Sequence, residues 1–402
     1  MIAGLFSLGL AMASMALGIG LVLPLLPVFA TDLGASGFMV GLIFGINPIV
    51  RGILMPVFGR YSDLSGKKFL MLLGLGGNVL CGLGFALSEA AWHLFVLRMV
   101  QGALTAAVMP TAMAYAGNLS SHGREGSVMG LFFLSFMLGL AGGPVVGGAM
   151  AEAYGYAVPF YTMALMSGIA FLLVLLLVPE QKAGDTASAT KPLSFATILS
   201  ERVVQGLLVG RGFNAMSIGI YFAILPLVAT LTHGMGSTQI GIIVSSQIIT
   251  MAPLQPVFGR LADMVSRVAL GAVGLAVASA SLIMIPWARG FNDLLVLSML
   301  LGLSGAIFNP SAVAIAVHLG RGMGMGSLLG LLEMAMALGM GIGSMSSGLL
   351  SDLFSLEFAL QVGAVAGLLA VAAFYLMTRS YRHLAHQTET DPAVRASGPD
   401  RE

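Results

Sequence analysis

The sequence has 402 residues, of which 57% are hydrophobic and 9% charged, with a formal net charge of +1. So few charges cannot cover the surface of a soluble protein of this length, and long apolar runs instead predict membrane-spanning helices. The single cysteine, Cys81, excludes an internal disulfide and a multi-cysteine metal site, and we expect no metal, no cofactor and no nucleic-acid partner.

Clusters of charged residues, Pro and Gly divide the chain into twelve apolar segments, and none shows the alternation of a β-barrel strand. We predict helices at about 3–30, 37–61, 68–88, 92–118, 125–152, 156–179, 198–231, 236–262, 267–287, 291–319, 322–350 and 356–379. The fold class is therefore an all-α membrane protein with two six-helix bundles. Residues 1–179 form the first bundle, 180–197 a linker, 198–379 the second bundle and 380–402 a polar tail.

A repeat with an offset of 200 residues relates the two bundles. Pro256-Val-Phe-Gly259-Arg260-Leu-Ala-Asp263 repeats Pro56-Val-Phe-Gly59-Arg60-Tyr-Ser-Asp63 at six of eight positions. The same offset joins Gly41 to Gly241, Gly102 to Gly302, Pro110 to Pro310 and Gly143 to Gly343. Parallel repeats of this kind are typical of transporters whose halves rock around a central binding site.

Basic residues gather on one side of this predicted topology, whereas the opposite loops hold only Arg289. The basic side carries Arg60, Lys67, Lys68, Arg124, Lys182, Lys191, Arg202, Arg260, Arg267, Arg321, Arg379 and Arg382. By the positive-inside rule, this side is cytoplasmic, as are both termini and the linker. We expect a multi-pass protein of a bacterial inner membrane.

The turn after the second helix, Gly59-Arg-Tyr-Ser-Asp63-Leu-Ser-Gly66-Lys67-Lys68, resembles the signature loop of the major facilitator superfamily, and the resemblance extends over all twelve helices. It implies that Asp63 latches this loop to helix 11 in an outward-facing state, with glycines permitting the tight turn. A plain cytoplasmic turn would explain the two lysines but not the ordered glycines. The second copy, around Asp263, has Ser266 in place of the glycine. Whether this copy also forms a latch is therefore an open question.

The fourth helix carries Arg98, Gln101 and Gly102 in the R-x-x-Q-G pattern that resembles a proton-coupling motif of this family. Arg98, Gln101 and Thr105 share one helical face. Because an unpaired arginine deep in a bilayer costs about 2.5–3.5 kcal/mol, we expect this face to point into a cavity. Alternatively, Arg98 braces the backbones of neighbouring helices.

The fifth helix is similar to the antiporter motif of drug:proton exporters. Its matching residues are Gly130, Gly139, Gly143, Pro144, Gly147 and Gly148. Glycines let helices approach closely, and Pro144 is expected to bend the helix at the interface between the halves. Generic helix packing is the alternative. The first helix also resembles these exporters, but Ser14 and Met15 stand near the position of their usual carboxylate.

Four ionisable side chains lie well within the predicted helices: Arg51, Arg98, Arg211 and Glu333. Such residues are functional candidates by default. Glu333 is the only carboxylate near the predicted midplane. Because burial and a nearby arginine act on a carboxylate's proton affinity in opposite directions, Glu333 can load and release a proton between two states. The alternative is a permanent structural pair with one arginine.

The predicted substrate cavity is lined by polar residues of several helices: Asn47, Arg51, Gln101, Thr105, Arg211, Asn214, Tyr221 and Asn309. Twenty-seven methionines and 22 phenylalanines suit an adaptable apolar cavity. The excess of membrane arginines instead favours an anionic or zwitterionic substrate.

The sequence therefore predicts a proton-coupled secondary transporter of the drug-exporter branch, which exports small amphipathic compounds by alternating access as a monomer in the lipid bilayer. A transporter of an anionic metabolite or lipid is the first alternative. A membrane-embedded enzyme or receptor is the second, although the sequence offers neither an H-E-x-x-H nor a G-x-S-x-G motif.

Overall fold

The computed structural model describes residues 2–65, 67–118, 125–180, 195–323, 325–379 and 381. Eleven of its helices are long and apolar enough to cross a membrane, and α1 with α2 forms a bent twelfth span. The helices of the first half are α1 (Ile2–Val22), α2 (Leu26–Asp32), α3 (Gly37–Ser65), α4 (Lys67–Ala86), α5 (Ala91–Asn118), α6 (Glu125–Tyr154) and α7 (Ala157–Leu177). Those of the second half are α8 (Phe195–Ser200), α9 (Arg202–Leu227), α10 (Ser237–Met264), α11 (Arg267–Met284), α12 (Phe291–Met323), α13 (Met325–Leu353) and α14 (Leu356–Thr378). The all-α fold with twelve spans is confirmed.

Three details differ from the predicted helices. The first span is not continuous, because α1 and α2 meet at an angle of 41° around Pro24, which has no N–H for the helical ladder. α12 continues to Met323 instead of ending near residue 319, since a charge at a membrane surface can face water without ending a helix. The predicted seventh helix starts as the separate short helix α8, which begins within the predicted linker and ends at Ser200, before α9 begins at Arg202.

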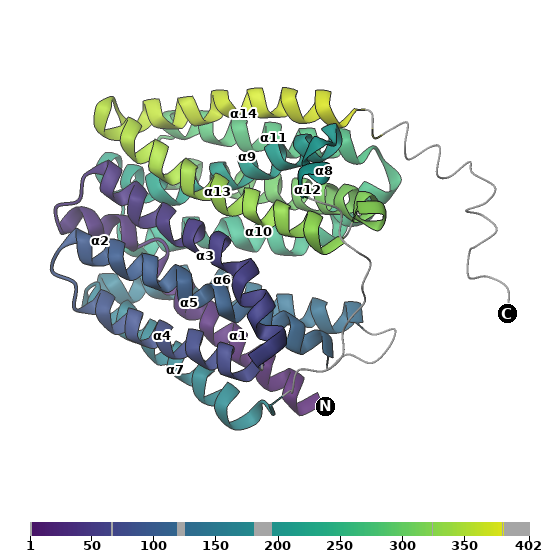
Figure 1. The fold of residues 1–402 in the computed structure, drawn as a ribbon. Coiled ribbons are helices and arrows are strands. Elements are labelled where there is room, and N and C mark those ends of the chain that lie inside the picture. Colours follow the sequence, from purple (N-terminus) through teal and green to yellow (C-terminus); the bar gives the residue numbers. More distant parts are fainter. Residues whose placement is uncertain are drawn as a thin grey trace, which may run out of the picture.

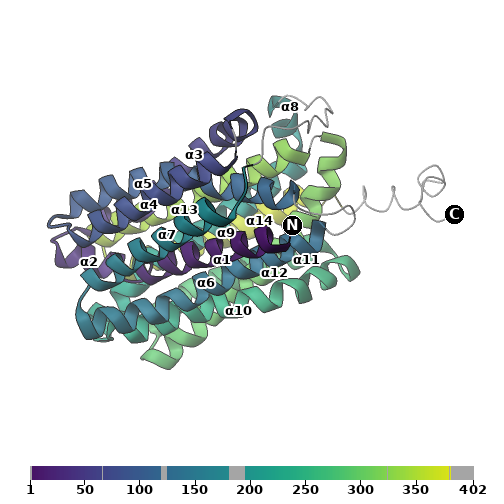
Figure 2. The same cartoon turned by 90° about the horizontal axis from the view of Figure 1, so that it is seen from below.

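The two halves lie one above the other in Figure 1, with the helices of each half running side by side. The start of α1 and the end of α14 lie at the same end of the bundle, which we call the termini side. The opposite end, the far side, carries the turns at residues 33–36, 87–90, 155–156, 233–236, 288–290 and 354–355. Figure 2 shows the same bundle turned by 90° and seen from below.

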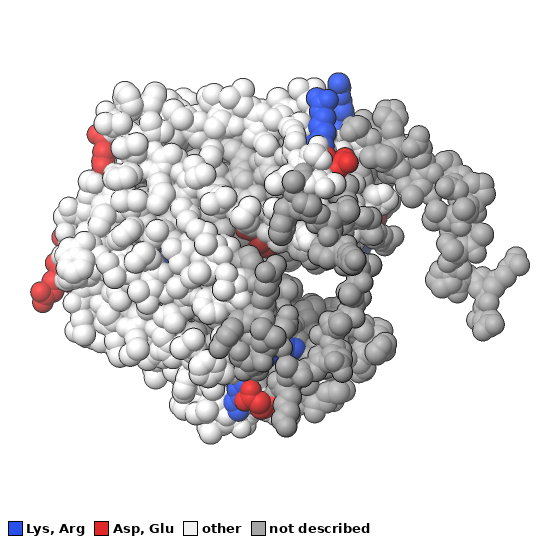
Figure 3. All heavy atoms as spheres, viewed as in Figure 1, with Lys and Arg blue, Asp and Glu red and all other residues white. Residues whose placement is uncertain are grey.

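Two repeat-related helices hold the halves together. α6 packs between α1 of its own half and α10 of the other half, and α13 packs in the same way between α9 and α3. Figure 3 shows the surface hollowed between the halves toward the termini side. Acidic side chains appear at the far side in that view. The halves therefore meet toward the far side, where loop-end residues such as Gly37 and Asp352 are in contact.

Candidate functional site

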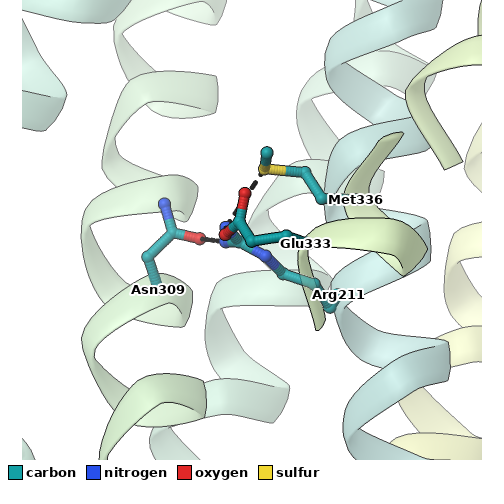
Figure 4. A network of polar contacts seen from close by, with 4 residues as sticks. All are labelled: Arg211, Asn309, Glu333 and Met336. Carbon is teal, nitrogen blue, oxygen red and sulfur yellow. Dashed lines mark hydrogen bonds and ion pairs between the residues drawn. The ribbon is translucent and has the colours of Figure 1, made fainter. Parts of the chain in front are cut away.

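The central polar cluster forms around Arg211 on α9 (Figure 4). Its guanidinium donates to Asn309 Oδ1 at 2.6 Å and forms an ion pair with Glu333 Oε1 at 3.2 Å. The Sδ atom of Met336 lies 3.1 Å from the same guanidinium. Arg211 thus joins α9, α12 and α13 of the second half within one cluster.

Solvent reaches the ion pair at Glu333 more than at Arg211. The Glu333 side chain is 42% exposed, whereas that of Arg211 is 14% exposed. Glu333 lies about 12 Å along α13 from its first residue, which is near the middle of a bilayer core about 30 Å thick. The carboxylate is therefore open to water and solutes while its arginine stays packed.

A positive charge of the first half acts on this cluster. Arg51 on α3 interacts electrostatically with Glu333 across the two halves and with Arg98 within its own half. Among the described residues, the ion pairs within 4 Å are Arg211–Glu333 and the surface pair Arg267–Asp263. Neither Arg51 nor Arg98 belongs to such a pair, so the first half contributes positive charge.

Arg98 belongs to a polar network inside the first half. Its Nη1 donates to Gln101 Oε1 at 2.8 Å and its Nε to the Ile43 carbonyl at 3.2 Å. Gln101 Nε2 donates onward to Asn78 Oδ1 at 2.9 Å, and Asn78 Nδ2 to Ser167 Oγ at 3.0 Å. The network crosses α3, α4, α5 and α7.

The Arg98 network borders a small internal space. The Phe44 ring centroid lies 5.6 Å from the guanidinium carbon, and Phe44, Arg98 and Gln101 line a cavity of about 10 Å³. Asn47 Nδ2 donates to the Arg98 carbonyl at 3.2 Å, and Thr105 Oγ1 to the Gln101 carbonyl at 2.8 Å. A space of this size holds about one water molecule, so it is too small for a substrate.

Two predicted cavity residues, Asn214 and Tyr221, lie away from open space. Tyr221 is fully buried and shares a hydrogen bond of 2.8 Å with Ser298. Asn214 is also buried, and its Nδ2 has no hydrogen-bond partner among the described residues. The prediction that both side chains face a cavity is wrong for this conformation, because α9 is packed by α11, α13 and α14 on most of its surface.

The glycines of α6 differ in what they touch. Gly139, Gly143 and Gly147 lie against the backbone of α1, and Gly148 lies against Ser237 of α10. The Pro144 carbonyl contacts Gly241 of α10. Gly130 is exposed and has no atom within 4 Å of where a side chain would begin, so it does not share the packing role.

The predicted latch is only partly within the described residues. The side chains from Gly59 to Ser65, including Asp63, and all of Gly66 lie outside them. Lys67 is buried, and Lys68 Nζ donates to the Leu175 carbonyl of α7 at 2.8 Å. In the second copy, Asp263 pairs with Arg267 of its own half at 3.3 Å.

Sequence reasoning missed several partners. Apart from their spacing along a helix, nothing in the sequence indicated that Met336 and Asn78 contact the predicted site residues. Glu152 and Asp352, acids of the far side, are not among the predicted site residues, although they stand 200 residues apart, the offset of the repeat. That spacing could have marked them as an equivalent pair. The described residues include no group of three or more His, Cys, Asp or Glu that could hold a metal ion.

Comparisons with known proteins agree with this architecture. The model of the Major Facilitator Superfamily matches residues 8–210 and 207–398. An uncharacterized MFS-type transporter of Methanocaldococcus jannaschii is 25% identical over 307 residues, covering 75% of this chain and 79% of that protein. The multidrug resistance protein MdtG of Enterobacter lignolyticus is 25% identical over 318 residues, covering 74% and 73%. The quinolone resistance protein NorA of Staphylococcus aureus is 30% identical over 175 residues, covering 44% and 45%.

Solved structures share the fold. A bacterial homologue of the human lysosomal transporter Spinster, in an inward-facing and unoccupied conformation, superposes with a TM-score of 0.82 at 14% identity, covering 94% of this chain and 97% of that one. The human organic anion transporter TETRAN superposes with a TM-score of 0.65 at 19% identity, covering 92% and 99%.

Proposed function

The chain belongs to the major facilitator superfamily, and we propose that within it this protein is a proton-coupled transporter that exports small amphipathic compounds. Similarity to MdtG and NorA, whose names denote multidrug and quinolone resistance, supports the drug-export branch. The basic residues of the termini side support a cytoplasmic placement of both termini. The opening of the structure would then face the cytoplasm, where such a pump loads its cargo.

The pair of Arg211 and Glu333 is the observation that carries this proposal. A carboxylate paired with an arginine is held in its ionised form, and loss of that partner or of solvent favours the protonated form. Because the Glu333 side chain is nearly half exposed, it is open to both protons and solutes. Proton binding to Glu333 would release Arg211 for other contacts.

Arg51 offers a way to couple this proton to movement. It acts on Glu333 from the opposite half, so its distance to the carboxylate must change when the halves rock. The electrostatic support for ionised Glu333 therefore differs between conformations. A proton taken up in one conformation is released in the other.

Arg98 acts as a positioning residue in this scheme. Its hydrogen bonds to Gln101 and to the Ile43 carbonyl fix the α3–α5 contact. Its charge also repels Arg51. Arg98 thereby helps to direct Arg51 toward the other half and Glu333.

A transporter of an organic anion is the second candidate. Arg51 and Arg98 form no ion pair within 4 Å among the described residues, so the first half can offer positive charge to a solute. The shared fold with an organic anion transporter is compatible with this function but shows the fold alone.

Transport by purified protein in proteoliposomes tests the first proposal. We expect Glu333→Gln to abolish export driven by a pH gradient, while Glu201→Gln, at an exposed position before α9, keeps it. Full gradient-driven exchange by Glu333→Gln would disprove the carrier assignment. Selective loss of anion uptake in Arg51→Gln, with drug export unchanged, would favour the second candidate.

A further inference from the structure

A carboxylate of the second half caps a helix of the first half at the far side. Asp352, near the end of α13, accepts the Gly37 N–H on Oδ1 at 2.7 Å and the Phe38 N–H on Oδ2 at 2.8 Å. These are the first two residues of α3. Both oxygens of one acid therefore bind the N-terminus of a helix from the opposite half.

A second contact has the same form with the halves exchanged. Glu152, near the end of α6 in the first half, accepts the Thr238 N–H on Oε2 at 3.0 Å. Thr238 is the second residue of α10 in the second half. The Thr238 side chain also hydrogen-bonds to Glu152, and Gln239 binds the neighbouring Gly236 N–H from within α10.

The two contacts are related by the sequence repeat. Residues 152 and 352 differ by 200, as do residues 38 and 238. Each half therefore supplies one acid and one helix N-terminus. The packing beside them is also equivalent, because Gly148 lies against Ser237 and Gly348 lies against Gly37.

The first N–H groups of a helix have no partner within the helix, and its N-terminus carries a partial positive charge. A carboxylate satisfies both needs through charge-assisted hydrogen bonds. Because Asp352 and Glu152 each bind a helix of the other half, their bonds exist only while the far side is closed. Separating the halves there breaks them.

We propose that Asp352 and Glu152 form a paired gate that stabilises the conformation closed at the far side, and that Asp352 is the stronger member. This gate is independent of Glu333 and of any substrate. Asn at position 352 would turn its NH₂ group, which cannot accept a hydrogen bond, toward one of the two backbone N–H groups. Glu152 instead binds one backbone N–H and one side chain, both of Thr238, and Gln at position 152 keeps a neutral oxygen that can accept from the N–H.

Distances between spin labels on the two halves test the gate. Exposed far-side positions suit labelling through Glu89→Cys and Arg289→Cys, in a background in which the buried Cys81 is replaced by Ala. Without substrate or gradient, we expect Asp352→Asn to raise the ratio of open to closed distances about tenfold, and Glu152→Gln about threefold. The double variant should combine both effects.

Glu357→Gln is the matched control, because Glu357 lies at the far side and its hydrogen bonds stay within its own half. It should leave the distances unchanged. A double variant with the parent distribution, or an equal shift in the control, would overturn the proposal. If Asp352→Asn does not fold, Glu152→Asp decides the test. The shorter side chain keeps its charge but cannot reach Thr238. An unchanged distribution of spin-label distances in this variant would overturn the gate. The outcome is independent of whether Glu333 carries a proton.

Discussion

Single side chains with two partners carry much of this molecule's polar structure. Arg211 links Asn309 to Glu333, and Gln101 links Arg98 to Asn78. Where the partner is buried, as Asn78 is, such a linking residue matters because the freed partner has no water with which to replace its hydrogen bond. The loss of one side chain therefore leaves two groups unsatisfied.

Replacement of Gln101 by Leu tests this at residue scale. The change removes the acceptor of Arg98 Nη1 and the donor to Asn78 Oδ1, and Asn78 is fully buried. Each buried unsatisfied group costs about 1–3 kcal/mol. We expect a clearly lowered melting temperature of the purified protein. Thr105→Val should change it little, because Thr105 bonds only to carbonyls of its own helix; an equal effect of both variants would contradict the network.

At the scale of elements, close approach of backbones explains how α6 and α13 hold their neighbours. Along α6, Gly143 and Gly147 meet α1, and along α13, Gly339 and Gly343 meet α9. Association of helices in lipid depends on van der Waals contact, since no hydrophobic driving force acts between them. Gly139 also meets α1, and the repeat relates Gly139 and Gly143 to Gly339 and Gly343, so both halves use one packing scheme.

Two substitutions in α6 test whether a motif glycine matters because it packs against α1. A Cβ atom at Gly143 would lie 2.6 Å from Gly20 Cα, whereas one at Gly130 would meet open space. We expect Gly143→Ala to lower the melting temperature, since the α1 backbone must move. Gly130→Ala should be neutral or slightly stabilising, because Ala favours helices by up to about 1 kcal/mol over Gly. Equal destabilisation by both would mean that the contacts with α1 are not the reason for these glycines.

For the whole molecule, the distribution of charges predicts its orientation. A membrane-impermeant maleimide should label Arg289→Cys in intact cells, and should label Glu201→Cys only after permeabilisation. Both positions are exposed, one on the far side and one on the termini side. The parent protein provides the control, because its Cys81 is buried. The reverse labelling pattern would contradict the positive-inside assignment.

The spans were predictable from sequence because each is a long apolar run bounded by polar turns. Pro24 shows the limit of this reasoning: its ring breaks a helix within an unbroken apolar run. The link between Arg211 and Glu333 could be expected only as one of several pairings, since it depends on how α9 and α13 are rotated. Tyr221 and Asn214 were misassigned because the sequence does not tell which sides of α9 are covered by other helices.

The exchange of acids between the halves bears on the origin of the molecule. In the far-side contacts, an acid of the first half meets a helix of the second, and the equivalent acid of the second meets the equivalent helix of the first. A two-fold symmetric dimer makes its contacts in this reciprocal form. Before gene fusion, two copies of a single six-helix chain would have met face to face. One acid and one helix N-terminus in each copy would have sufficed for both contacts.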